Sequence, residues 1–193
     1  MKPLRRDDLF TLEHYARIRA QYRAGIIEHK KNRRLPIGEH AALYFEDRLT
    51  MQYQVQEMLR IEKIFEEEGI AEELRVYNAL IPDGHNWKAT FMMEYADERE
   101  RRSALAALIG IEHLVWVQID GHERVRAIAN EDLPRSNDDK TASVHFMRFE
   151  LTPSMVDAAK AGAAIDAGID HERYRHQVRV PQNVRDALAL DLD

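Results

Sequence analysis

The spacing of apolar residues changes half-way along this chain of 193 residues. In residues 7–31, apolar and aromatic side chains recur every three or four positions, which predicts one helix, or two joined near Ala20, with Asp7 or Asp8 as the N-cap. In residues 87–95, apolar side chains alternate with polar ones, which predicts a strand with one apolar face. A chain that combines these two periods in successive parts is expected to adopt an α+β fold.

The other elements are predicted from the same two patterns and from their end signals. Helices are expected at about 46–68, closed by Gly69, at 71–79, at 97–108, after Pro153 and after Pro181; strands are expected at 41–45, 114–119, 123–128 and 141–151. We therefore predict a single domain, 1–193, with a mainly antiparallel sheet of about five strands covered by helices and one long central helix. Its N-terminal part, about 1–80, is helical, and the sheet-containing part is about 81–193.

Composition excludes several classes of protein. The formal net charge of −6 argues against a dedicated nucleic-acid binder, because such domains are usually basic. The absence of cysteine excludes disulfides, thiolate zinc sites and iron–sulfur clusters ligated by this chain. No stretch resembles a signal peptide or stays apolar over the ~18 residues that a membrane span needs. We expect a cytoplasmic protein without membrane contact.

The helix predicted at 46–68 carries the first candidates for a functional site. One arc of this helix is apolar and consists of Met51, Val55, Met58, Leu59 and Phe65. Glu62 lies in the middle of the arc, so we expect it to be buried and paired with a basic or hydrogen-bond-donating group. Glu57 and Glu62 are candidates for proton transfer or metal binding, and the alternative is that they only pair with basic residues. Apolar residues occur almost all round the helix, which favours a homo-oligomer.

The histidines do not follow the spacing of known metal motifs. None has an acidic residue three positions before it, as a ferritin-like di-iron centre requires. The tandem histidines at 171–176 are one residue too far apart for a zincin motif. A mixed metal site remains open, with His29 or His40 from one segment and Glu57 from another. His145, in the strand predicted at 141–151, is a further catalytic candidate.

The candidate ligand site lies on the sheet face that points away from the core. If Trp87 and its alternating neighbours point to the core, the opposite face carries Lys88, Thr90, Glu94, Gln118, Arg126, Arg148 and Glu150. The two arginines, Arg126 and Arg148, could bind an anion that Glu94 and Glu150 orient. The alternative is a ladder of Arg–Glu pairs on an exposed face, in which each pair contributes roughly 0.2–1 kcal/mol.

Other chemical signals are weak. The sequence contains neither a Gly-rich phosphate-binding motif nor a Gly-x-Ser-x-Gly elbow, so it gives no support for nucleotide binding or α/β-hydrolase chemistry. The basic stretch at 30–34 follows the first predicted helix. It is interpreted either as a solvated helix end, where the helix dipole favours cations, or as a site for an acidic partner.

Four strings carry a resemblance to a known family: HKKNRR at 29–34, FEDRLTMQYQVQEMLRIE at 45–62, YNALIPDGHNWKATFMMEY at 77–95 and SVHFMRFELT at 143–152. Over nearly its whole length, the chain resembles the bacterial domain-of-unknown-function family 3501. The family has no established activity or catalytic residues. Its members are often encoded near rubrerythrin-like proteins and an iron–sulfur oxidoreductase, so the resemblance implies a link to peroxide or iron redox metabolism.

Two functions follow from these observations. The first is a non-catalytic accessory protein that docks on a rubrerythrin-like or iron–sulfur redox partner. The alternative is an enzyme or ligand-binding protein with an internal Glu/Arg/His pocket, with or without a metal.

Overall fold

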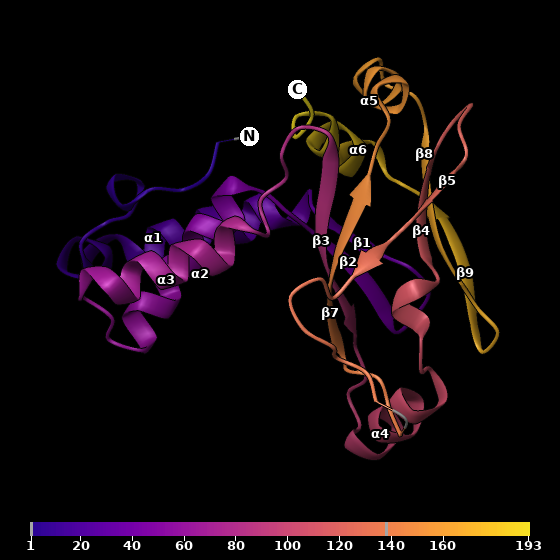
Figure 1. Ribbon diagram of the computed structural model, residues 1–193, viewed down its shortest axis with the longest axis horizontal. Helices are drawn as coiled ribbons and strands as arrows, with labels where there is room; N and C mark the ends of the chain where they lie inside the picture. Colours follow the sequence, from indigo (N-terminus) through magenta and orange to yellow (C-terminus); the bar gives the residue numbers. More distant parts are fainter. Residues whose placement is uncertain (1, 138) are drawn as a thin grey trace.

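Two antiparallel sheets and the helices around them form the structure, a computed structural model that describes residues 2–137 and 139–193 (Figure 1). The helices are α1 (Leu12–Lys31), α2 (Arg48–Ile61), α3 (Glu67–Asn78), α4 (Glu98–Ala107), α5 (Pro153–Lys160) and α6 (Gln182–Ala189). The strands are β1 (Arg34–Pro36), β2 (Ala41–Glu46), β3 (Asn86–Met93), β4 (Val115–Ile119), β5 (Arg124–Arg126), β6 (Ile128–Ala129), β7 (Val144–Glu150), β8 (Ile165–His171) and β9 (Tyr174–Arg179). The predicted α+β class is confirmed.

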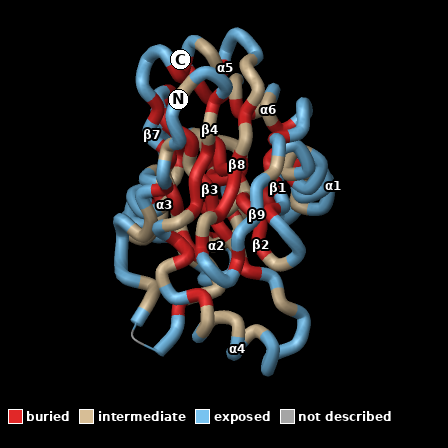
Figure 2. Tube along the Cα trace, turned by 90° about the vertical axis from the view of Figure 1, so that its right-hand side faces the viewer, coloured by how far each residue is buried: buried red, intermediate tan, exposed pale blue. Residues whose placement is uncertain are grey.

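The two sheets pack face to face. The first sheet has the strand order β1-β2-β3-β7-β6, and the second has the order β5-β4-β8-β9. Their facing sides are apolar and buried; they include Phe45, Trp87, Phe91 and Phe149 of the first sheet and Val115, Val117, Ile165 and Ile169 of the second. Figure 2 shows these buried strands in the middle of the molecule. The interior sides of β3 and β4 are therefore as predicted.

The prediction that 87–95 and 114–119 share one sheet is corrected. β3 and β4 lie in different sheets and meet only through their apolar faces. Alternation along a strand predicts which side chains point inward, but it does not identify the neighbouring strand. The polar faces of the two strands consequently lie on opposite outer sides of the sandwich.

α2 packs against both α1 and α3, and the three helices lie beside the first sheet (Figure 1). Their apolar sides form a cluster that is separate from the core of the sandwich. Met51, Val55 and Leu59 of α2 are buried in this cluster, so this part of the predicted apolar arc is confirmed. The N-terminal part also supplies β1 and β2 to the first sheet. Among the described residues, no helix has both the length and the apolar character that crossing a membrane requires.

The prediction of one long helix over 46–68 is wrong beyond Ile61, where α2 ends. The chain turns after Ile61 in a Schellman motif, in which Ile64 N donates to Leu59 O over 2.9 Å. Lys63 takes the left-handed backbone conformation of this motif, with a φ of 55°. Glycine is the usual residue at that position. Because a lysine takes its place here, the sequence does not show that the helix ends.

This turn changes the environment of the residues that follow α2. Glu62 is exposed and Phe65 is 70% exposed, so the predicted burial of both residues is wrong. Met58 is partly buried. Gly69, the predicted end of the helix, lies inside α3.

Helix starts follow their capping residues. α1 begins later than predicted, because Thr11 Oγ1 accepts a hydrogen bond from His14 N over 3.2 Å. The predicted N-cap residues lie in a preceding 3₁₀ helix, Arg6–Asp8. α4 and α5 begin where predicted, capped by Asp97 and Thr152.

The sequence patterns do not predict the hairpin formed by β8 and β9. β8 reads IDAGIDH, which includes residues that are uncommon in strands. Gly168 of β8 lies against Trp116 of β4, and a Cβ atom at this position would lie 2.4 Å from the indole ring. The glycine is therefore required by a strand from another part of the chain. The tandem histidines at 171–176 lie in this hairpin and not on a helix.

Candidate functional site

A groove lies between the helices α2 and α3 and the outer face of the first sheet. It consists of two hollows that share Leu80 and Phe146. The Glu46 hollow has a volume of about 420 Å³, and its lining includes Lys30, Tyr44, Glu46, Met51, Tyr77 and Thr90. The Lys88 hollow has a volume of about 310 Å³, and its lining includes Ala79, Lys88, Glu131, Asp132 and Arg148. Both volumes lie at the lower end of the range of small-molecule sites, roughly 300–1,000 Å³.

The strand register brings the polar side chains of this face into rows. Glu46 of β2, Lys88 of β3 and Arg148 of β7 are cross-strand partners and form one row. Tyr44, Thr90 and Phe146 form the next row. Because alternate residues of a strand share a face, both rows point to the groove.

Lys88 is a half-buried lysine without a partner. Within residues 2–137 and 139–193, no hydrogen bond or ion pair joins its ammonium group to another residue. Burial lowers the pKa of Lys88 below its usual value, and the nearby Glu131 carboxylate offsets this only in part. The ammonium group has thus lost part of its hydration, while the carboxylates of Glu131, Asp83 and Glu150 act on it only from beyond ion-pair distance.

Arg148, the neighbour of Lys88, is already paired. Its Nε and Nη2 atoms donate to the two carboxylate oxygens of Glu131 over 2.9 and 2.8 Å. Its Nη1 atom donates to Glu150. These bonds occupy the N–H donors of the guanidinium group that would otherwise bind an anion. The predicted alternative of Arg–Glu pairs therefore describes the surroundings of Arg148.

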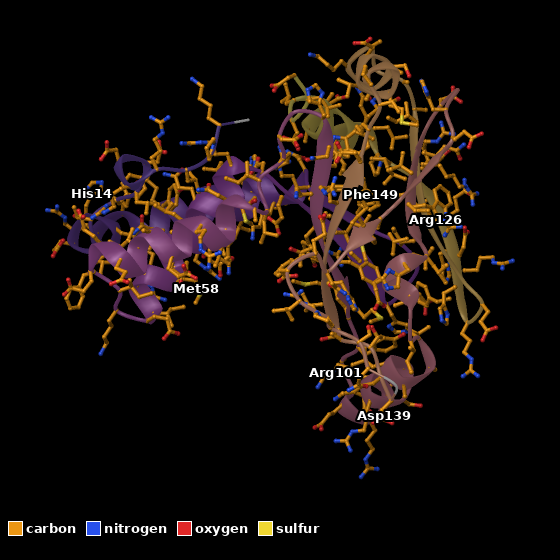
Figure 3. All side chains as sticks on the ribbon, in the orientation of Figure 1. His14, Met58, Arg101, Arg126, Asp139 and Phe149 are labelled. Carbon is orange, nitrogen blue, oxygen red and sulfur yellow. The ribbon has the colours of Figure 1, made fainter. Side chains whose placement is uncertain are left out.

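The other residues predicted for the ligand pocket lie elsewhere. Glu94, just after β3, accepts a hydrogen bond from Tyr44 Oη. Arg126 and Gln118 belong to the second sheet, where Arg126 Nη2 donates to Asp170 Oδ2 over 2.9 Å. Figure 3 shows Arg126 on the side of the sandwich away from the helices α1, α2 and α3. The predicted pocket, which draws on both sheets, is therefore not formed.

Glu46 is a functional candidate that sequence reasoning missed. It ends β2, is 8% exposed, and accepts hydrogen bonds of 2.7 Å from Thr50 Oγ1 and Thr90 Oγ1. In the part of the chain that the structure describes, no ion pair joins Glu46 to another residue, although the Arg33 guanidinium group interacts with its carboxylate from a longer distance. The alternation of β3 already placed Lys88 and Thr90 on this face, but no motif marks a glutamate at a strand–helix junction.

Comparisons with known proteins identify the family. The model of the family described as "Protein of unknown function (DUF3501)" matches residues 3–192. The chain belongs to this family. It is also similar to a crystal structure of a novel protein of unknown function from Burkholderia pseudomallei K96243, with 50% sequence identity, a TM-score of 0.94 and 100% of each chain covered. The search of curated proteins gives no match. The resemblance inferred from the four sequence strings is therefore confirmed.

In this DUF3501 chain, Glu57 joins α1 to α2 and lies outside the lining of the groove. Its carboxylate accepts two hydrogen bonds of 2.8 Å from Arg19 and one of 2.6 Å from Tyr15 Oη. The hydrogen bonds from Arg19 lower the pKa of Glu57 to about 2. This geometry favours the alternative in which Glu57 pairs with basic residues.

Replacing Glu57 by glutamine is expected to lower the free energy of unfolding at neutral pH by about 2 kcal/mol, because hydrogen bonds to a charged group are lost. The folded pKa of about 2 lies below the ordinary value of 4.5. The contribution of the carboxylate is therefore present above the ordinary value and is lost as the pH falls toward the folded one. Urea unfolding at neutral pH and in acid should show that the two proteins differ less in acid. A difference that does not change with pH would contradict this account.

The histidines predicted as metal ligands have separate partners. His29 Nε2 lies 2.6 Å from Asp47 Oδ2. The His40 ring stacks on Tyr95 with 4.2 Å between the ring centres. In the described ranges, histidine and carboxylate side chains do not gather in groups of three that could hold a metal ion. The structure thus does not bring His29, His40 and Glu57 together.

His145 belongs to a buried polar network beneath the loop that precedes β7. Its Nε2 atom lies 2.9 Å from Ala142 O, and its Nδ1 atom lies 3.0 Å from Asn130 Nδ2. A carbonyl oxygen only accepts, so Nε2 carries a proton, and the contact with the amide nitrogen of Asn130 fits an Nδ1 atom that accepts, which corresponds to the neutral ring. Burial lowers the pKa of His145, which favours this neutral form. The side chain is 0% exposed, so a substrate cannot touch it in this conformation.

Proposed function

We propose that this protein binds a small organic anion in the groove and that the Lys88 ammonium group holds the acid group of this ligand. The charge balance around Lys88 supports the proposal. Arg148 already has two carboxylate partners, whereas Lys88 has none among the described residues. A carboxylate or phosphate group of a ligand would supply the missing anion through a charge-assisted hydrogen bond.

The walls of the Lys88 hollow suit a ligand with an apolar stem. Ala79, Leu80 and Phe146 line the hollow beside the ammonium group. A charge pair in such a partly enclosed site is stronger than in bulk water, because the local dielectric constant is lower. The proposal keeps the small-molecule function inferred as an alternative from the sequence, with Lys88 in place of the arginines.

Hexanoate is a suitable probe, because it joins an acid group to a short apolar stem. We expect saturable binding of hexanoate, followed by NMR chemical shifts, to the unmodified protein. We expect at least about ten-fold weaker binding to Lys88→Met, in which the charge is lost but the apolar volume is kept. Lys160→Met is the matched control, because Lys160 is exposed at the end of α5 and outside the groove. Equal affinities of the three proteins, or no saturable binding to the unmodified protein, would overturn the proposal.

The accessory role in peroxide or iron redox metabolism stays a prediction that rests on the family resemblance. Its test is a pull-down from native cells, in which recovery of neither a rubrerythrin-like nor an iron–sulfur protein would count against it. A homo-oligomer also stays a prediction. A second copy would cover the apolar hollow of about 590 Å³ along α1, which Ile18, Tyr22 and Ile26 line.

A further inference from the structure

We infer that the ligand of the groove carries an amine as well as an acid group, with the amine held by Glu46 and the acid group held by Lys88. The inference rests on the proposed function and adds a second point of recognition. It would restrict the ligand class to zwitterionic molecules whose two charges are joined by an apolar stem.

The first argument is that Glu46 and Lys88 do not neutralise each other. They are direct partners across β2 and β3, and opposite charges at such positions commonly interact. Here the Glu46 carboxylate turns to the hydroxyl groups of Thr50 and Thr90. Lys88 lines the adjacent hollow and has no ion pair within the described residues. Two opposite charges therefore stay available along one groove.

The second argument is the lining of the Glu46 hollow. The aromatic residues Tyr44, Tyr77 and Phe146 line the same hollow as the buried carboxylate. The faces of aromatic rings attract cations, and a buried carboxylate is stabilised by a cation that replaces its lost hydration. Two hydroxyl groups already hold Glu46, so an amine would meet an acceptor that needs little reordering.

The third argument is the connection between the two hollows. They share Leu80 and Phe146, so two apolar side chains border both hollows. A ligand that spans both hollows would contact these side chains with a hydrocarbon stem, and the burial of each CH₂ group contributes about 0.8 kcal/mol. An amine and an acid at the two ends of such a stem match the charges of the groove.

Lys30 provides a test of whether the Glu46 hollow binds a positively charged group of the ligand. It also lines the Glu46 hollow, and its ammonium group lies 5.8 Å from the centre of the Tyr53 ring. A cation at this position repels a ligand amine. We therefore expect Lys30→Met to bind an amine-bearing ligand more tightly than the unmodified protein does.

The experiment compares hexanoate with 6-aminohexanoate, which differs from it by one terminal amine. We expect the unmodified protein to bind 6-aminohexanoate at least about ten-fold more tightly than hexanoate. Glu46→Gln should abolish the preference for the amine, so that the ratio of the affinities for 6-aminohexanoate and hexanoate falls to about one. Glu123→Gln is the control, because Glu123 is exposed and lies between β4 and β5, outside the lining of both hollows.

The outcomes separate this inference from the proposed function. If both probes bind equally well, or if Glu46→Gln binds 6-aminohexanoate as the unmodified protein does, the inference is overturned while the role of Lys88 stands. If hexanoate binding does not depend on Lys88, both are overturned. Should Glu46→Gln fail to fold, Lys30→Met decides: tighter binding of 6-aminohexanoate supports the inference, and unchanged or weaker binding overturns it.

Discussion

Replacing Arg33 by methionine is expected to lower the free energy of unfolding by about 3–5 kcal/mol. Arg33 is 4% exposed and donates to the two oxygens of Asp191 over 2.7 and 2.8 Å. Its Nε atom also lies 2.9 Å from Asp47 Oδ2. The substitution leaves Asp191, which is 2% exposed, buried without its partner. Urea unfolding followed by circular dichroism measures the loss.

The position of this ion pair explains why the expected effect is large. Arg33 follows α1, Asp47 caps α2, and Asp191 follows α6. The pair thus joins the helical part to the C-terminal segment, which packs on the sandwich through Leu188 and Leu192. The double variant with Arg33→Met and Asp191→Leu removes both charges of this pair, and Asp47 keeps its contact of 2.6 Å with His29 Nε2, so most of the loss should be recovered. A loss below about 1 kcal/mol for Arg33→Met would show that the pair contributes little, as exposed pairs do.

Replacing Trp87 by alanine is expected to lower the free energy of unfolding by about 3–5 kcal/mol, as for other large aromatic residues in a core. Trp87 of β3 is 0% exposed and lies edge-on to Phe45, with 6.5 Å between the ring centres. Its Nε1 atom donates to Leu188 O over 3.1 Å. The substitution leaves a cavity between the sheets and removes one of the hydrogen bonds to Leu188 O, which still accepts from Asp191 N over 3.2 Å. The thermal midpoint and the urea midpoint should both fall.

Trp87→Phe separates the cavity from the hydrogen bond. Phenylalanine retains most of the buried area but has no N–H donor, so we expect a smaller loss, about 1–2 kcal/mol. Equal losses for the alanine and phenylalanine variants would assign the effect to the hydrogen bond alone. That result would contradict the cavity argument.

The fold elements that were predicted correctly are those whose signals lie within a few residues. The alternation at 87–95 predicted β3 and its buried side, because side chains of a strand alternate between two faces. The spacing of Met51, Val55 and Leu59 predicted the buried side of α2 for the corresponding reason in a helix. Caps such as Asp97 and Thr152 act within one helical turn, so they too can be found in the sequence.

The site was predicted only in part. Alternation placed Lys88, Arg148 and Glu150 on one face, and the strand register confirms this arrangement. The sequence could not show that Glu131 pairs with Arg148 and leaves Lys88 without an ion pair, since Glu131 reaches this face from just after the end of β6, a two-residue edge strand beside β7. Ion pairs between such segments depend on distances of a few ångströms that no local pattern encodes.

The sequence by itself determined the two periods, the inward faces of β3, β4 and α2, and the family to which the chain belongs. Only the tertiary structure shows that β3 and β4 lie in different sheets, because the alternation of side chains does not identify the neighbouring strand. It also decided the end of α2, where packing of Ile64 on the helical cluster accompanies a left-handed turn at Lys63. The groove also depends on the tertiary structure, because its walls come from helices and strands that only packing brings together.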